Sequence, residues 1–278
     1  MNLNWFESML YGLFSGLMDI LPVSAQAHRI LMLKFFGVRG NLDLIHLMIR
    51  LGICAALYLT TQKQLTRMRR ARMLARIPKK KRKRPLDTRS MMDSSMLITM
   101  LTPALVGVYF YQRLAHLGNN LVLLALFILL NGLIVFVPRF RATGNRDCRT
   151  LSRVEGLLMG LGGTMSAVPG FSAMGVTTAV ASVCGVERTY ALDMALMMNL
   201  GLNIGLAVLD FLGILSNGLG LLSFGIVLRY LVTGAIAFGG ATAGIRLMRR
   251  WAETNGYTAF AFYCFGQALF TFIFNLMA

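Results

Sequence analysis

The chain is poor in charged side chains, and above all in acids. Only 14% of its 278 residues are charged, and 11 Asp plus Glu stand against 28 Lys plus Arg, for a net charge of +17. Hydrophobic residues make up 56% of the chain, and the mean hydropathy is +0.63. This composition excludes a soluble globular enzyme and a disordered chain. It predicts several apolar helices of about 20 residues, the length that crosses roughly 30 Å of hydrocarbon.

Cysteine is also scarce. Three of the 4 cysteines, Cys54, Cys184 and Cys264, lie in apolar stretches, Cys148 lies in a basic loop, and no two have CxxC spacing. This excludes a disulfide scaffold, and we interpret the cysteines as small hydrophobic residues. The N-terminus lacks the basic segment of a signal peptide, since its first charge is Glu7, so we expect the first apolar segment to remain in the mature protein.

Hydropathy divides the chain into ten apolar stretches, and four of them are too short to span a bilayer. The short stretches form two pairs, broken by Pro22 and Pro169, where a helix must kink or stop. We therefore predict an all-helical polytopic membrane protein with six spans and two opposed re-entrant hairpins. The alternative is that glycine and proline only let two helices pack closely. The ten stretches lie at residues 5–21, 23–37, 41–60, 94–115, 119–138, 154–168, 171–185, 190–214, 219–244 and 257–277.

The distribution of charge predicts the orientation of the spans. With six crossings, the connections at 61–90, 139–153 and 245–256 share one face and hold 13, 5 and 3 Lys or Arg. The loops near 116–119 and 215–218 hold none, so the positive-inside rule places the basic face in the cytoplasm and both termini outside. Three basic residues flank the first hairpin on the outer side and depart from the rule: Arg29, Lys34 and Arg39.

The same topology makes the chain one membrane domain with two inverted halves. The first, 1–140, contains the hairpin at about 5–37, and the second, 151–278, contains the hairpin at about 154–185. A glycine precedes each hairpin proline by six residues and a Ser-Ala pair follows each proline. Inverted repeats whose broken helices meet near the midplane are typical of transporters.

The basic segment at 61–90 contains the run Lys79-Lys80-Lys81-Arg82-Lys83-Arg84. In a soluble protein such a run would suggest nucleic acid binding. Beside a spanning helix we instead expect it to fix orientation and to contact anionic lipid headgroups. We predict no nucleic acid partner, and the sequence leaves the oligomeric state open.

Ionisable residues at membrane depth are costly and therefore mark candidate functional positions. Asp19 precedes Pro22 by three residues, and Ser24, Gln26 and His28 follow it, which predicts a polar cluster at the tip of the first hairpin. The second tip offers Ser172, Gly170, Gly175 and free backbone N–H groups at the start of a helix, which suit an anion such as phosphate. We expect both tips to converge on one ligand.

Arg50 is a further candidate because it falls midway along the 41–60 stretch. His46 and Asp43 precede it by one and about two turns, so the three can share a face directed at the polar site. Alternatively, Arg50 pairs with Asp19 or a backbone carbonyl and only holds the bundle together. Two acids near opposite ends of the span at 190–214 fit interface or structural roles: Asp193 and Asp210.

The segment from Gly16 to His28, GLMDILPVSAQAH, resembles the first signature of the undecaprenyl-diphosphate phosphatase (bacitracin-resistance) family, EGLTEFLPVSSTGH. The segment Pro169 to Gly175, PGFSAMG, resembles the second signature, PGTSRSG. The similarity extends over nearly the whole chain. It implies a membrane-embedded enzyme with two opposed re-entrant hairpins, which hydrolyses undecaprenyl diphosphate to recycle the cell-wall lipid carrier with a divalent cation.

Three signature positions differ in ways that bear on the chemistry. The first glutamate of the family is Ser15 here, the second serine is Ala25, and the arginine of the second signature is Ala173. A carboxylate, a hydroxyl and a guanidinium are lost together, and each such group supports the transfer of a phosphoryl group. The family usually has glutamine at Arg50, which therefore offers a replacement cation.

The leading hypothesis is a family member in the bacterial inner membrane that handles polyprenyl phosphate or diphosphate and hydrolyses undecaprenyl diphosphate if the altered site is active. A catalytically degenerate carrier or flippase is the alternative, and a protein that sequesters the lipid is a third. If the site is active, we predict Asp19 for Mg²⁺ or Ca²⁺ binding or proton transfer and His28 as base or nucleophile. Ser24 and Ser172 would contact phosphate or replace the nucleophile. Gly170 and Gly175 would contact phosphate, and Arg50 would clamp its charge.

Overall fold

The computed structural model describes residues 3–38, 40, 42–82, 85–217, 223–253 and 257–277. Within these residues the regular structure is helical, and six helices are long and apolar enough to cross a membrane. These six coincide with the six long stretches of the hydropathy prediction. Arg39 and the last two residues of the predicted basic run lie outside the described residues. In chain order the helices are α1 (Trp5–Ile20), α2 (Ala25–Phe35), α3 (Asp43–Ala75), η1 (Lys79–Lys81), α4 (Thr88–Leu114), η2 (Ala115–Asn119), α5 (Leu121–Phe136), η3 (Val137–Phe140), α6 (Arg153–Met165), α7 (Ala173–Val183), α8 (Arg188–Asn217), α9 (Phe224–Glu253) and α10 (Thr258–Met277).

Two helical hairpins, α1–α2 and α6–α7, are built in the same way. The first helix of each begins with a capping box, Asn4 with Glu7 in α1 and Ser152 with Glu155 in α6. The second helix of each begins at a serine cap in the hairpin turn. Because a capping box and a serine cap satisfy helix N–H groups that have no partner within the helix, each short helix has a defined start.

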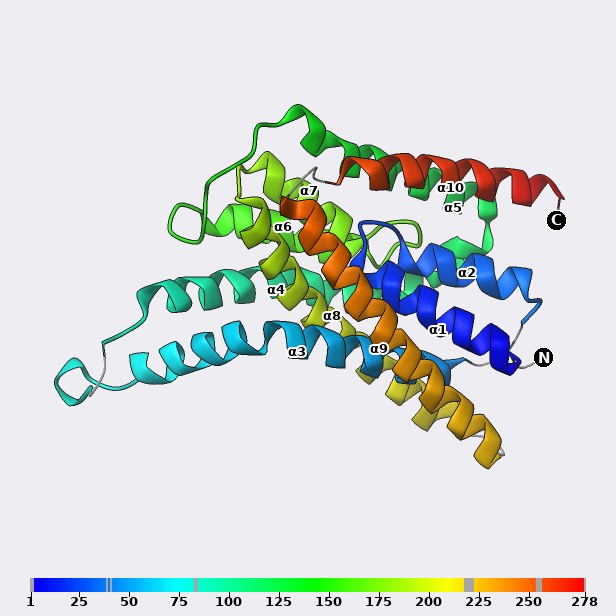
Figure 1. Cartoon of the computed structure of the whole chain (residues 1–278), viewed down its shortest axis with the longest axis horizontal. Coiled ribbons are helices and arrows are strands. Elements are labelled where there is room, and N and C mark those ends of the chain that lie inside the picture. The colour runs from blue at the N-terminus through cyan, green and yellow to red at the C-terminus, as the bar shows by residue number, and fades with distance from the viewer. Residues whose placement is uncertain are drawn as a thin grey trace.

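The hairpins enter the helical bundle from opposite ends. The start of α1, the end of α10 and η2 lie at one end of the molecule, whereas the α3–α4 connection and the start of α6 lie at the other (Figure 1). Helix α1 packs along α9, and α6 packs along α4. Helix α5 also packs along α10, and α3 packs along both α8 and α9. The turns of the two hairpins are thereby brought together inside the bundle.

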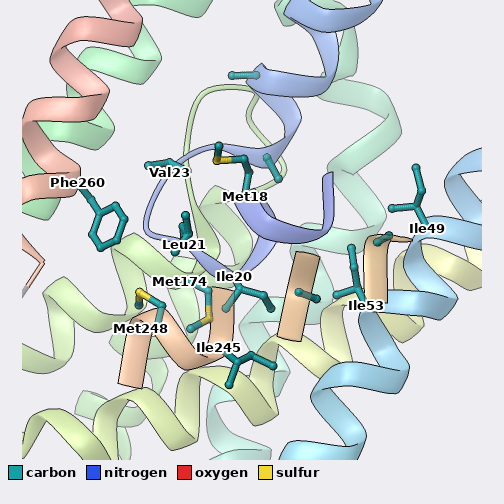
Figure 2. Packing of buried hydrophobic residues seen from close by; sticks show 14 of the residues in the cluster. Met18, Ile20, Leu21, Val23, Ile49, Ile53, Met174, Ile245, Met248 and Phe260 are labelled. Atoms are coloured by element: carbon teal, nitrogen blue, oxygen red, sulfur yellow. The ribbon is translucent and has the colours of Figure 1, made fainter. Parts of the chain in front are cut away.

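A hydrophobic core supports the turn of the first hairpin. Ile20 and Leu21, at the end of α1, are buried against Met174 of α7 and Met248 of α9. Figure 2 shows these side chains together with residues from α3 and α10. This packing fixes the turn from several sides through close van der Waals contact, the main attraction between apolar side chains inside a membrane-embedded bundle.

Arg146 joins the two ends of the second hairpin. Its Nη1 donates to Glu155 Oε1 at 2.6 Å, at the start of α6, and to Cys184 O at 2.7 Å, at the end of α7. The hydrogen bonds from this guanidinium lower the pKa of Glu155 to about 2. The arginine therefore closes the base of the hairpin, outside the six spanning segments.

Candidate functional site

The two hairpin turns are hydrogen-bonded directly to each other through Ser24. This serine caps α2 and is buried, with 1% of its surface exposed. Its Oγ accepts the N–H of Ala27, at 3.2 Å, and the N–H of Gly170 in the other hairpin, at 3.1 Å. Gly170 has a φ of +110°, a backbone conformation that favours glycine. The hydroxyl of Ser24 thus joins the two turns.

Ser172 makes the reciprocal connection from the second hairpin. It caps α7 by accepting the N–H of Gly175 at 3.0 Å, and its own hydroxyl donates to Leu21 O of the first hairpin at 3.2 Å. The N–H of Ser172 donates to Asn131 Oδ1 of α5 at 2.9 Å. The predicted phosphate contacts of both turns therefore lie together, and in this conformation their hydrogen bonds hold the turns closed.

Asp19 lies at the end of α1 and faces α8. Its Oδ2 accepts the side-chain N–H groups of Asn199, at 3.0 Å, and Asn203, at 2.8 Å. Its Oδ1 lies 3.7 Å from Nη2 of Arg29. The sequence analysis did not select the two asparagines or assign Arg29 to this site. The sequence nevertheless indicates these residues. The two asparagines are spaced i, i+4 within a predicted span, and Arg29 directly follows His28.

A small polar cavity lies between the hairpin turns and α8. Its volume is about 40 Å³, which holds about three or four waters at roughly 10–15 Å³ each. Asp19 is the one acid and Arg29 the one cation among the residues that line it. The remaining polar lining residues are Gln26, Tyr111, Ser166, Ser172, Asn199 and Asn203. A carboxylate, a guanidinium and several neutral donors around one space can hold a phosphoryl group and position water.

His28 lies away from this cavity, although the sequence predicts it in the same cluster. It lines an apolar cavity of about 520 Å³ between the first hairpin and α10, with Phe14, Leu31 and Phe270 among the other lining residues. Its Nδ1 lies 2.7 Å from the carbonyl oxygen of Ser24, which can only accept, so Nδ1 carries a proton. Its Nε2 lies 2.8 Å from the Tyr263 hydroxyl. Both ring nitrogens therefore already have partners.

Arg50 is held in the contact between α3 and α8. It is 1% exposed, and its Nε donates to Asp210 Oδ2 at 2.5 Å. Its guanidinium also lies 5.2 Å from the centre of the Tyr111 ring, and Tyr111 in turn lines the polar cavity. His46, one turn earlier on α3, bonds the hydroxyl of Tyr11 instead. The structure therefore connects Arg50 to the cavity through Tyr111 and does not place it among the lining residues.

The three altered signature positions lie at or near the cavity. Ala25 and Ala173 both line it, one from each hairpin. Ser15, one turn before Asp19, is 1% exposed, and its hydroxyl has no hydrogen-bond partner among the described residues. The hydroxyl and the guanidinium that the signatures would provide are thus replaced by two methyl groups facing the polar space.

The cavity fits a divalent cation only in part. No three His, Cys, Asp or Glu side chains converge anywhere in the described chain. Asp19 is the one carboxylate at the cavity, and Arg29 already opposes it. Mg²⁺ is commonly bound by one or two carboxylates together with substrate phosphates. Asp19 fits such a role once the oxygens of a bound diphosphate complete the ligand set, whereas the chain alone does not form a cage.

The family model and the similar proteins of known name agree on one family. The chain is 26% identical to an undecaprenyl-diphosphatase of Methanobrevibacter smithii, with 96% of each chain covered. It is 24% identical to undecaprenyl-diphosphatase 1 of Shouchella clausii, over 97% of this chain and 96% of that protein. A family model described as bacitracin resistance protein BacA matches residues 8–270, so the match begins within the first turn of α1, includes both hairpin turns and ends within α10. The chain therefore belongs to the bacitracin resistance protein BacA family.

Proposed function

We propose that this protein is a multi-pass membrane phosphatase that hydrolyses undecaprenyl diphosphate to undecaprenyl phosphate and inorganic phosphate. The observation that carries the proposal is the polar cavity between the two hairpin turns, in which Asp19 and Arg29 face one small space. Membership of the BacA family and the similarity to undecaprenyl-diphosphatases support the same activity.

The apolar cavity supports a lipid substrate. It offers about 520 Å³ next to the first hairpin, and apart from His28, Tyr263 and Gln267 its lining is aliphatic, aromatic or glycine. A polyprenyl chain can pack against such an apolar surface without burying polar groups, while the diphosphate enters the polar space. Ser24 lies between the two cavities, because its carbonyl bonds His28 and its hydroxyl bonds Gly170.

In this proposal water attacks the terminal phosphorus, the bridging P–O bond breaks, and undecaprenyl phosphate leaves. Asp19 accepts a proton from the attacking water, oriented by Asn199 and Asn203. Metal binding is the alternative role for Asp19: it would then hold a divalent cation, which would supply charge neutralisation at the diphosphate. Because the cavity of about 40 Å³ is smaller than a diphosphate, the hydrogen bonds between the turns must open to admit the substrate.

The two halves are inferred to form an inverted repeat with re-entrant hairpins. The hairpins share their capping pattern and approach from opposite ends, and α1 packs on α9 as α6 packs on α4. We further infer that the basic end faces the cytoplasm of a bacterial cell and contacts anionic lipids, following the positive-inside rule.

The test is phosphate release from undecaprenyl diphosphate by purified protein in detergent, with Mg²⁺, with Ca²⁺ and with chelator. We expect release by the wild type and a loss of about 10²–10³-fold for Asp19→Asn, the usual cost of removing one group preorganised for the transition state. Asp193→Asn is the matched control, because Asp193 lies on α8 at a separate cavity near the basic end. No release from wild-type protein that still binds the lipid would contradict the proposal and favour a carrier.

A further inference from the structure

Arg29 is a buried cation at the polar cavity. It is 6% exposed, and it lies one turn after Ala25 on α2, whose carbonyl accepts its Nε at 3.3 Å. Its Nη2 is 3.7 Å from Asp19 Oδ1, long compared with the roughly 2.7–2.9 Å of a charge-assisted hydrogen bond. Burying a guanidinium is expensive unless a full set of partners satisfies it. A carbonyl and a distant carboxylate leave most of its five N–H donors for a ligand.

The cavity around Arg29 contains other polar groups without partners. Oδ1 of Asn203 and Oε1 of Gln26 are buried and have no hydrogen-bond partner among the described residues. Both residues line the cavity with Arg29. Both atoms are amide oxygens, which only accept hydrogen bonds, so a donor such as a water molecule within the cavity would satisfy them. The charged donor of the lining is Arg29, and its remaining N–H groups are available to an anion that enters the space.

Ala173 lines the same cavity from the facing hairpin, at the first residue of α7. The second family signature has arginine at this position. We propose that Arg29 is the phosphate-binding cation of this protein and that it replaces, from the first hairpin, the guanidinium missing at Ala173. This inference rests on the proposed function for the identity of the substrate, the terminal phosphoryl group of a polyprenyl diphosphate.

The decisive experiment measures binding of two lipids, undecaprenyl diphosphate and undecaprenol, which has the same chain without phosphate. Arg29→Gln should weaken binding of the diphosphate about 10–100-fold, the range for losing charge-assisted hydrogen bonds, and leave undecaprenol unchanged. Arg29→Gln/Ala173→Arg should recover at least part of that loss, because position 173 faces the same space. Lys34→Gln is the control, since Lys34 is an exposed cation on the same helix.

If Arg29→Gln binds undecaprenyl diphosphate as tightly as the wild type does, the proposal is wrong. An equal loss for both lipids would also overturn it, because it would show that Arg29 only supports the fold. If Arg29→Gln does not fold, Arg29→Lys replaces it in the test. Lysine keeps the positive charge but lacks the planar guanidinium, so we expect Arg29→Lys to bind the diphosphate more weakly than the wild type. Adding Ala173→Arg to this variant should restore the binding. The binding measurement does not depend on hydrolysis. If the wild type binds the diphosphate but does not hydrolyse it, the proposed activity is refuted, while the comparison of Arg29→Gln with the wild type still tests the role of Arg29.

Discussion

At the scale of single residues, the buried pair of Arg50 and Asp210 has a measurable role in stability. Replacing Arg50 by Gln removes the ion-pair partner of the Asp210 carboxylate, whose side chain is 9% exposed. We expect a loss of about 3–5 kcal/mol, the usual cost of leaving a buried charge uncompensated, and substantial recovery in Arg50→Gln/Asp210→Asn. Thermal unfolding in detergent measures both effects. A double variant as unstable as the sum of the single variants would contradict this coupling.

The control for that measurement is the pair formed by Arg249 and Asp193. Its N–O distance is 3.4 Å, but the side chain of Arg249 is 46% exposed. Exposed pairs contribute about 0–1 kcal/mol, so Arg249→Gln should hardly change the unfolding temperature. A comparable loss of stability in Arg50→Gln and Arg249→Gln would mean that burial does not determine how much an ion pair contributes to stability.

The residues of the candidate site were only partly predictable from the sequence. Asp19, Ser24 and Ser172 could be selected because proline and glycine mark the turns and polar residues are rare there. Arg29 was interpreted as an exception to the charge rule on the outer side, yet it is buried beside Asp19. Sequence spacing gives a residue's place on its own helix but not which other helix covers it. The same limit hid the two asparagines of α8 that bind Asp19.

At the scale of helices, close approach of α1 and α9 depends on Gly240. A Cβ added there would lie 2.5 Å from the carbonyl oxygen of Leu13, a backbone atom that cannot move aside cheaply. We expect Gly240→Ala to destabilise the protein by about 1–3 kcal/mol through overpacking, and thus to lower its unfolding temperature by several degrees. The neighbouring Gly239 has no described atom within 4 Å of such a Cβ, so Gly239→Ala should be neutral or stabilising. Equal shifts for the two variants would contradict this account.

The helices themselves were better predicted than their ends. Prolines placed both hairpin turns correctly between short helices, with α1 ending at Ile20 and α2 beginning at Ala25. The first long stretch was expected at 41–60, whereas α3 continues to Ala75. Hydropathy detects only the apolar part of a helix, while hydrogen bonding continues through a basic extension. Helix α4 likewise includes Pro103, so proline did not end a helix there.

At the scale of the whole molecule, contacts between helices follow one pattern in both halves. Helix α1 packs on α9 and α6 packs on α4, while α3 with α8 and α5 with α10 form the contacts between equivalent helices. An exchange of the halves maps the α1–α9 contact onto the α6–α4 contact, and it maps the α3–α8 and α5–α10 contacts each onto itself. This is the arrangement expected of the inverted repeat, which stays a prediction together with its boundaries at 1–140 and 151–278. In such a repeat both hairpins reach one central site from opposite sides.

The orientation of the molecule in the membrane gives the last prediction. Three connections hold 21 of the 28 Lys and Arg residues, and the α3–α4 connection, which holds most of them, lies at the end of the molecule opposite the start of α1 (Figure 1). In a variant without native cysteines, Asn119→Cys should react with a membrane-impermeant maleimide on intact cells. Lys80→Cys and Thr143→Cys should react only after permeabilisation, because positive loops stay in the cytoplasm. All three positions are exposed, so accessibility within the protein does not limit labelling. Labelling of Lys80→Cys in intact cells would reverse the orientation and would place the first hairpin on the cytoplasmic side.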